Sequence, residues 1–222
     1  MRIAAFETST DWCSVALWID GEIGALERCA GHRHTEFALP MLERLMANSG
    51  FDATALDAIA FGAGPGSFTG LRIACGLAQG LALARGLPVF GVSTFDAIAD
   101  ESGASRVVVC IDARMREVYY ACLERAGGAW RAAISPHCVP PATVAPPPGT
   151  GWVGCGSGFS AYPELQECVG GRVLPQVHPS AVAVARLAAP RLARGEGVDA
   201  ALAAPDYLRD KVAMTIEERG GR

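Results

Sequence analysis

The 222-residue sequence lacks the basic surface of a protein that binds nucleic acid by itself. Its formal net charge is −4, and no run of Lys or Arg is present. Outside the tail, the closest basic pair is Arg114 and Arg116. Contacts to phosphates supply most of the affinity of nucleic-acid-binding proteins, and these contacts need a basic face. If RNA is a substrate, we therefore expect a partner to hold it.

Cysteine pairing and long apolar runs are missing as well. None of the eight cysteines forms a Cys-x-x-Cys pair, which is typical of reduced cysteines acting as small hydrophobic side chains in a cytosolic protein. The apolar residues 73–84 are too few to span a bilayer. The N-terminus reaches Glu7 before a signal-peptide core could form. We expect a soluble cytoplasmic protein without membrane contact.

Signatures of catalysis are also absent. The glycine-rich segment GPGSFTGLR (residues 64–72) lacks the Gly-Lys-Ser/Thr of a P-loop. Ser67 is not in a Gly-x-Ser-x-Gly elbow, and we interpret it as the N-cap of the next helix. His32 and His34 have no ligand partner at helical spacing. We therefore predict no catalytic residue and no metal site in this chain.

The first half of the sequence reads as three strands followed by alternating helices and strands. Residues 2–6, 13–19 and 22–29 alternate as strands, and Asp20-Gly21 is a hairpin turn. A helix follows over residues 35–48, capped by Thr35 and bent at Pro40. We then expect a strand, a helix, a strand and a short helix, over residues 56–61, 71–84, 89–92 and 95–101.

The same pattern restarts near Ser105. Strands are expected at 106–111, 117–123 and 130–134, then a proline-rich loop at 140–149, a strand at 152–156 and a helix at 180–193. Two βββαβαβ halves are the plan of the actin-like ATPase (ASKHA, ribonuclease H-like) α/β fold. We predict a first lobe over residues 1–104 and a reduced second lobe over 105–222, with the tail packing back on the first.

The glycine-rich turn has two interpretations. Backbone N–H groups at a helix start can bind an anion, or the turn can simply shape a helix that meets another protein. The actin-like plan would place an acidic residue and hydroxyls beside such a turn, and GCGSG (residues 154–158) is a candidate remnant of a second one. The predicted vestigial phosphate site consists of Glu7, Thr8, Ser9, Gly64, Gly66 and Ser67.

Small residues recur every four positions in the helix expected at 71–84. Gly76 and Gly80 form one series, and Ala74, Ala78 and Ala82 continue another. Each interior glycine costs about 1 kcal/mol relative to alanine, so a packing reason is needed. Small residues at this spacing let two helices approach closely. We predict a subunit interface at His34, Leu39, Leu42, Leu45, Met46, Leu71, Ala74, Cys75, Ala78, Gly80 and Ala82.

Six ordered motifs make the chain resemble the TsaB (YeaZ) family of bacterial tRNA threonylcarbamoyladenosine synthesis. These motifs are ETST (7–10), HTE with LP (34–36, 39–40), GPGSFTGLRI (64–73), GVST (91–94), IDARMREVY (111–119) and PDYLR (205–209). Each is weakly specific, but the ordered set covers nearly the whole chain. The resemblance implies a non-catalytic subunit that dimerises through the two helices, with itself or with the catalytic subunit TsaD.

Further expectations follow from this resemblance. TsaD-like chains bind a metal through His-x-x-x-His, and the matching positions here are Thr94 and Ile98. TsaD would hold the metal and transfer the threonylcarbamoyl group to the adenosine beside the anticodon, with a TsaE-type ATPase as a further partner. This chain would have no cofactor of its own, although ATP or ADP could bind at the partner interface. It would meet tRNA only through the complex and form a homodimer when alone.

Two other function classes stay open at this point. An independent actin-like ATPase or phosphotransferase is the main alternative, and an altered opening motif together with the lack of an adenine motif argues against it. A metallopeptidase is the second, and Thr94 and Ile98 argue against that. The charged segment DARMRE (112–117) is either a solvated turn or a partner or interdomain contact, with Arg114 as a forked donor.

Overall fold

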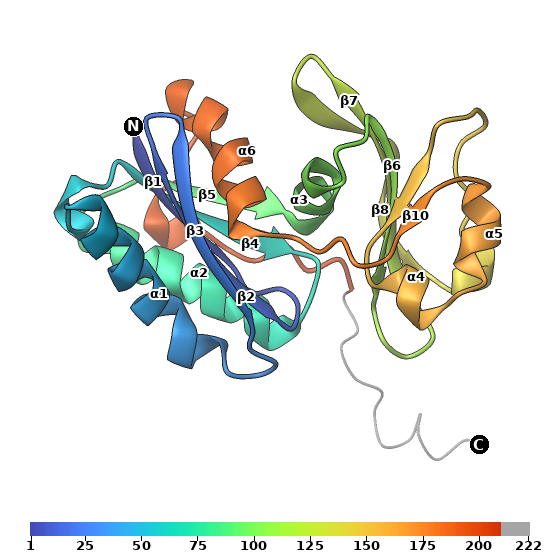
Figure 1. The fold of residues 1–222 in the computed structure, drawn as a ribbon, viewed down its shortest axis with the longest axis horizontal. Coiled ribbons are helices and arrows are strands. Elements are labelled where there is room, and N and C mark those ends of the chain that lie inside the picture. The colour runs from blue at the N-terminus through green and yellow to red at the C-terminus, as the bar shows by residue number, and fades with distance from the viewer. Residues whose placement is uncertain (210–222) are drawn as a thin grey trace.

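The computed structural model describes residues 1–209, which form two lobes side by side (Figure 1). The first lobe is built on a sheet in the order β3-β2-β1-β4-β5. The first three strands are antiparallel, and β4 and β5 continue the sheet parallel to β1. Its strands are β1 (Arg2–Glu7), β2 (Trp12–Ile19), β3 (Glu22–Cys29), β4 (Ala58–Gly64) and β5 (Val89–Ser93).

The second sheet repeats this plan. Its order is β10-β9-β6-β7-β8, so that the first strand of each half is central, with its hairpin partners on one side and parallel strands on the other. The duplicated topology expected from the sequence is thereby confirmed. The strands are β6 (Arg106–Asp112), β7 (Val118–Ala126), β8 (Ala129–Val139), β9 (Val153–Cys155) and β10 (Val173–Leu174).

Helices cover both faces of the first sheet (Figure 1). The helices α1 (His34–Ser49) and α2 (Phe68–Leu83) pack on the face that carries Ala4 and Phe6. The helix α6 (Ala181–Ala193) packs on the opposite face, over Ile3 and Ala5. Since alternate residues of a strand point to opposite faces, covering both faces requires the continuously apolar sequence that β1 and β4 have.

The helices that cover the second sheet are shorter than those on the first. The helix α3 (Thr94–Glu101) lies between the lobes and packs on one face, and α4 (Gly158–Ala161) and α5 (Leu165–Val169) lie on the other (Figure 1). These two helices are only four and five residues long. The second lobe is therefore the reduced one, as the sequence predicted.

Lobes and sequence halves do not coincide fully. The boundary between residues 104 and 105 separates the strands of the two sheets, but α6 and the short 3-10 helix η3 (Ala200–Leu202) return to the first lobe. Ser180 caps α6 by accepting a hydrogen bond from the Ala183 N–H. Residues 210–222 of the predicted second lobe lie outside the described residues.

Some local predictions were wrong. The helix α1 begins at His34, one residue before the expected cap Thr35, and its N-cap Arg33 makes no side-chain cap bond. The proline-rich loop contains one helical turn, η2 (Pro141–Thr143). A similar turn, η1 (Ala53–Ala55), lies earlier in the chain. The sequence did not predict α4, α5 and β10, because elements of two to five residues are too short to show periodicity.

Within the described residues, no helix combines the length and apolarity needed to cross a membrane. All eight cysteines are free, and five of them are buried. Burial raises the pKa of the Cys13 thiol to about 11 and that of Cys155 to about 12. Such thiols stay protonated near neutral pH and act as apolar side chains, as expected from the sequence.

Candidate partner interface

The glycine-rich turn between β4 and α2 packs directly against the segment that follows β1. The backbone N–H of Ser67 donates a hydrogen bond of 2.7 Å to the carbonyl oxygen of Ser9. The hydroxyl of Thr8 donates one of 2.7 Å to the carbonyl oxygen of Gly70. Ser67 also caps α2 by accepting from the Gly70 N–H, which confirms its predicted role. Two halves of the predicted phosphate site are thus bonded to each other.

The glycines of this turn are needed because protein backbone lies where their side chains would be. A Cβ at Gly66 would lie 2.5 Å from the Ser9 carbonyl oxygen, and one at Gly70 would lie 1.9 Å from that of Thr8. In the second lobe, a Cβ at Gly156 would lie 2.5 Å from the Cys110 carbonyl oxygen. This close packing favours the structural interpretation of both glycine-rich turns over the phosphate-binding one.

Glu7 is fully buried at the end of β1. One of its oxygens, Oε1, accepts a 2.6 Å hydrogen bond from the Ser9 N–H, whereas Oε2 has no partner within the described residues. Burial raises the pKa of this carboxyl, and the hydrogen bonds from Ser9 only partly oppose the shift. A carboxyl that favours its neutral form is poorly suited to hold a metal-bound phosphate.

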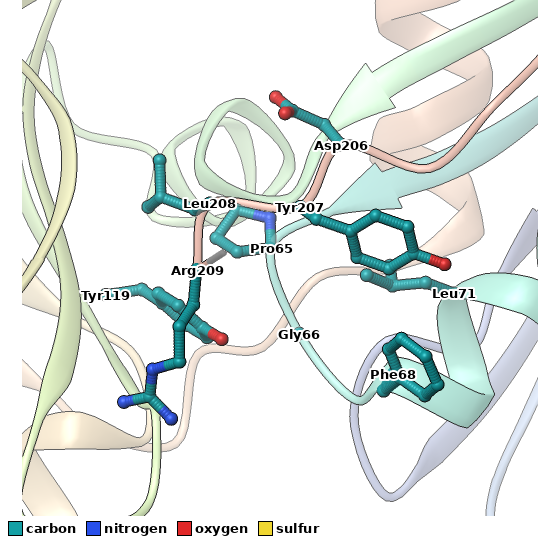
Figure 2. Close-up of a pocket in the computed structure, with 9 residues that line it drawn as sticks. All are labelled: Pro65, Gly66, Phe68, Leu71, Tyr119, Asp206, Tyr207, Leu208 and Arg209. Atoms are coloured by element: carbon teal, nitrogen blue, oxygen red, sulfur yellow. The ribbon is translucent and has the colours of Figure 1, made fainter. Parts of the chain in front are cut away.

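A small cavity lies between the lobes (Figure 2). Its volume is about 50 Å³, and its lining comes from the glycine-rich turn, α2, β7 and the tail: Pro65, Gly66, Phe68, Leu71, Tyr119, Asp206, Tyr207, Leu208 and Arg209. Pockets that hold drug-sized ligands and cofactors measure roughly 300–1,000 Å³. The cavity is therefore too small for a nucleotide in this conformation.

The tail crosses this cavity from one lobe to the other, and we call residues 203–209 the strap. In Figure 2, Tyr207 extends towards Phe68 and Leu71, while Arg209 lies beside Tyr119. The Asp206 N–H donates to the Ala63 carbonyl oxygen at 2.7 Å, which fixes the strap to the first lobe. A guanidinium nitrogen of Arg209 donates to the Ala113 carbonyl oxygen at 3.1 Å in the second lobe.

Most of the residues predicted to touch a partner are buried within the chain itself. They pack α1 and α2 onto the first sheet and belong to its core, so their assignment to an interface was wrong. These core residues are His34, Leu42, Leu45, Met46, Leu71, Ala74, Cys75, Ala78 and Ala82. A large side chain at Ala78 would disrupt the fold before it affected any partner.

The opposite face of α2 is exposed. At Gly76 and Gly80 an added Cβ would meet no atom of the described residues within 4 Å. Apolar side chains lie at the ends of the same face, Phe68 with 39% and Leu83 with 70% of its surface exposed. Leu39 on α1 is 41% exposed. Of the predicted interface residues, only Leu39 and Gly80 therefore lie on the surface.

The sequence contained a signal for this face. Residues 68, 72, 76 and 80 follow one another at four-residue spacing, as the buried series 70, 74, 78 and 82 does. Two residues along a helix correspond to a rotation of about 200°, so the two series lie on opposite faces. Phe68, Gly76 and Leu83 were missed because α2 is apolar nearly all round.

The positions that match metal-binding histidines lie inside the fold. Thr94 and Ile98 are buried in α3, and the Thr94 hydroxyl has no hydrogen-bond partner within the described residues. His34, at the start of α1, is buried as well. Across residues 1–209, no three His, Cys, Asp or Glu side chains are grouped so that they could hold a metal ion.

Comparisons with known proteins agree with this arrangement. The family model for "TsaD: tRNA N6-adenosine threonylcarbamoyltransferase" matches residues 23–217. A tRNA threonylcarbamoyladenosine biosynthesis protein TsaB from Escherichia coli K12 is 40% identical, and the match covers 96% of each chain. The TsaB of Haemophilus influenzae is 35% identical over 96% of this chain and 95% of its own.

A solved structure is similar throughout. YeaZ from Pseudomonas aeruginosa is 42% identical, with a TM-score of 0.87 over 93% of this chain and 99% of its own. Its similarity extends over both lobes, and so does that of the E. coli protein. The chain therefore belongs to the TsaB (YeaZ) family.

Proposed function

We propose that this chain acts in the synthesis of threonylcarbamoyladenosine on tRNA, as a non-catalytic subunit that binds and supports a TsaD-type catalytic subunit. The pathway is supported by the names of relatives that match nearly the full chain. The supporting role rests above all on one observation, the exposed α2 face on which Gly76 and Gly80 have no neighbour among residues 1–209. Two helices with small residues at their crossing can approach closely, so this face suits a partner helix.

The non-catalytic part of the proposal is supported by the residues at the expected metal and phosphate positions. Thr94 and Ile98 are core residues at the positions of metal-binding histidines. The turn at Gly66 and Gly70 is packed against protein backbone. In this proposal, the partner holds the metal and the reacting groups, and this chain orients the partner by binding it.

Other partners follow from the same proposal. A TsaE-type ATPase would join the complex, and ATP or ADP would bind at the interface between subunits. The small cavity between the lobes is consistent with this chain having no nucleotide of its own. Alone, the chain would form a homodimer through the same α1 and α2 surface. It would work in the cytoplasm and meet tRNA through the complex.

The test is light scattering after size exclusion, on the chain alone and mixed with the TsaD-type subunit of the same organism. The wild type should give a species with one copy of each. Gly80→Arg should abolish this species while keeping the wild-type circular dichroism, because the added side chain extends into open space. Ala132→Arg, at an exposed position on β8, is the matched control and should bind normally.

Two outcomes would contradict the proposal. If Gly80→Arg still forms the mixed species, the partner does not dock on this face of α2. If the wild type itself does not associate, with or without ATP, the supporting role fails. Titration of the chain with Mg-ATP would then test the alternative, an independent ATPase or phosphotransferase.

A further inference from the structure

The hairpin between β6 and β7 has an unusual backbone at its tip. Arg114, Met115 and Arg116 all adopt left-handed conformations, with φ of 60°, 54° and 61°. In this region the Cβ of an L-residue is crowded by the following carbonyl oxygen, so glycine and asparagine are the usual occupants. Three consecutive large side chains there are unfavourable for the turn itself. Such strain is typical of sites where a side chain must be presented in a fixed direction.

Hydrogen bonds hold the tip in this shape. The Ala113 N–H donates to the Glu117 carbonyl oxygen at 3.0 Å, and the Glu117 N–H donates to the Arg114 carbonyl oxygen at 3.0 Å. An Asp112 carboxylate oxygen accepts from the Arg114 N–H at 2.8 Å. All three tip side chains are exposed, with Arg114 82% and Met115 54% accessible to solvent.

The tip is connected to α2 through the strap. Arg209 donates to the Ala113 carbonyl oxygen at 3.1 Å and to the Met115 sulfur at 3.7 Å. Two residues earlier, the Tyr207 ring lies 5.4 Å from that of Phe68, and its hydroxyl accepts from Arg72 at 2.9 Å. Both of these residues are on α2. Contacts thus connect the α2 face, through exposed Tyr207 and the largely buried Arg209, with the tip on the other lobe.

We propose that the tip is a second contact for the protein that docks on α2, so that one partner touches both lobes. This inference rests on the proposed function and deepens it. The partner would offer an apolar hollow to the Met115 side chain, with carboxylates at its rim for Arg114 and Arg116. Met and Arg are both enriched in protein–protein interfaces, and Arg forms forked bonds with carboxylates.

A protein fits the tip better than an RNA backbone does. A thioether at the apex gains from burial in an apolar hollow and has nothing to gain from phosphates. The Asp112 carboxylate pairs with Arg114 at 3.2 Å, and Glu117 pairs with Arg209, so acidic groups lie directly behind the arginines. These two acidic groups would repel the closely spaced phosphates of an RNA backbone. Separate carboxylates at the rim of an apolar hollow can instead each pair with one arginine.

Calorimetric titration of the full chain with the TsaD-type subunit of the same organism tests this inference. Arg116→Glu should raise the Kd at least tenfold, and Arg131→Glu, the same charge change on β8, should not. Met115→Gly should raise the Kd several-fold while leaving the Tm equal or higher, since glycine relieves the left-handed strain. If the turn had only a structural role, this variant would bind the TsaD-type subunit with the wild-type Kd.

The outcomes separate this inference from the proposal on which it rests. If both tip variants bind like wild type while Gly80→Arg does not bind, the tip is no contact and the proposed function stands. If the wild type does not bind, both fall. If Arg116→Glu keeps the binary affinity but lowers retention of tRNA by the assembled complex, the tip contacts RNA and the inference is overturned.

Discussion

Glu7 shows how a single buried carboxyl is accommodated at the end of β1. Its Oε1 accepts from the Ser9 N–H, and its Oε2 has no partner among the described residues. A Cβ at Gly62 would lie 1.8 Å from Oε2, so the glycine leaves room for the carboxyl and nothing more. The surroundings therefore favour the neutral carboxyl, because desolvation penalises the charged form most.

Glu7→Gln should stabilise the protein above neutral pH. The pKa of Glu7 in the folded state lies above its unfolded value of 4.5, so its contribution to stability is fully present below about pH 4.5. That contribution decreases as pH rises through the folded-state pKa. Glutamine keeps the acceptor for Ser9 without the charge. Urea unfolding at pH 4 and pH 8 should show a gain at pH 8 and little change at pH 4; an equal effect at both would contradict the neutral carboxyl.

Gly70→Ala should strongly destabilise the chain. The new methyl group would lie 1.9 Å from the Thr8 carbonyl oxygen, and backbone on both sides has to move to make room. Overpacking of this kind costs about 1–3 kcal/mol, occasionally more. Chemical denaturation measures the loss, and wild-type stability would mean that the contact between the glycine turn and residues 7–9 is not tight.

At the scale of elements, α2 has two faces with opposite requirements. Its buried series, with Ala74 and Ala78, is small because the sheet lies close beneath it. Its exposed series, with Gly76 and Gly80, is small although no atom of residues 1–209 lies within 4 Å of where a Cβ would be. A partner helix docked on this face would give the second series its packing reason, as the proposed function requires.

Gly76→Ala should stabilise the isolated chain and weaken its association. Alanine is favoured over glycine in a helix by about 1 kcal/mol, and a Cβ at this position meets no described residue within 4 Å. The same methyl group would hold a partner helix further away. Thermal unfolding of dilute protein and the Kd for the partner measure the two effects. A less stable monomer, or unchanged affinity, would argue against the proposed interface.

Element order and sheet topology could be predicted because they depend on local patterns. Alternation in β2, the Asp20-Gly21 turn and the cap at Ser67 each act over a few residues. The interface residues could not be assigned, because periodicity identifies apolar faces without telling which of two faces meets the sheet. The tail was predicted to pack back on the first lobe, but its contact with the second lobe was not, since that contact joins residues more than 90 positions apart, Arg209 and Ala113.

On the scale of the whole molecule, ion pairs join the lobes behind the cavity. The Asp100 side chain on α3 is almost fully buried and pairs with two arginines. Arg125 reaches it from β7 of the second lobe at 3.2 Å, and Arg186 reaches it from α6 of the first. Together with the strap, this triad fixes the relative position of the two sheets.

Asp100→Asn should cost about 2 kcal/mol, the typical contribution of a hydrogen bond to a charged group. Both arginines are partly exposed and can regain water, which limits the loss. Glu36→Gln is the comparison, because its pair with Arg33 is exposed on both sides and its loss should change stability much less. Equal effects of the two substitutions in urea unfolding would show that the buried triad does not hold the lobes.

The path of the chain also sets an order for folding during translation. Residues 1–104 leave the ribosome first, yet the face of the first sheet with Ile3 and Phe90 gets most of its cover from α6, which ends at Ala193. That cover is made roughly 90 residues later, or several seconds at about 5–20 residues per second. The second sheet is complete by Leu174, so it can close before the first is covered. Nascent chains in this interval would present an apolar sheet face to chaperones.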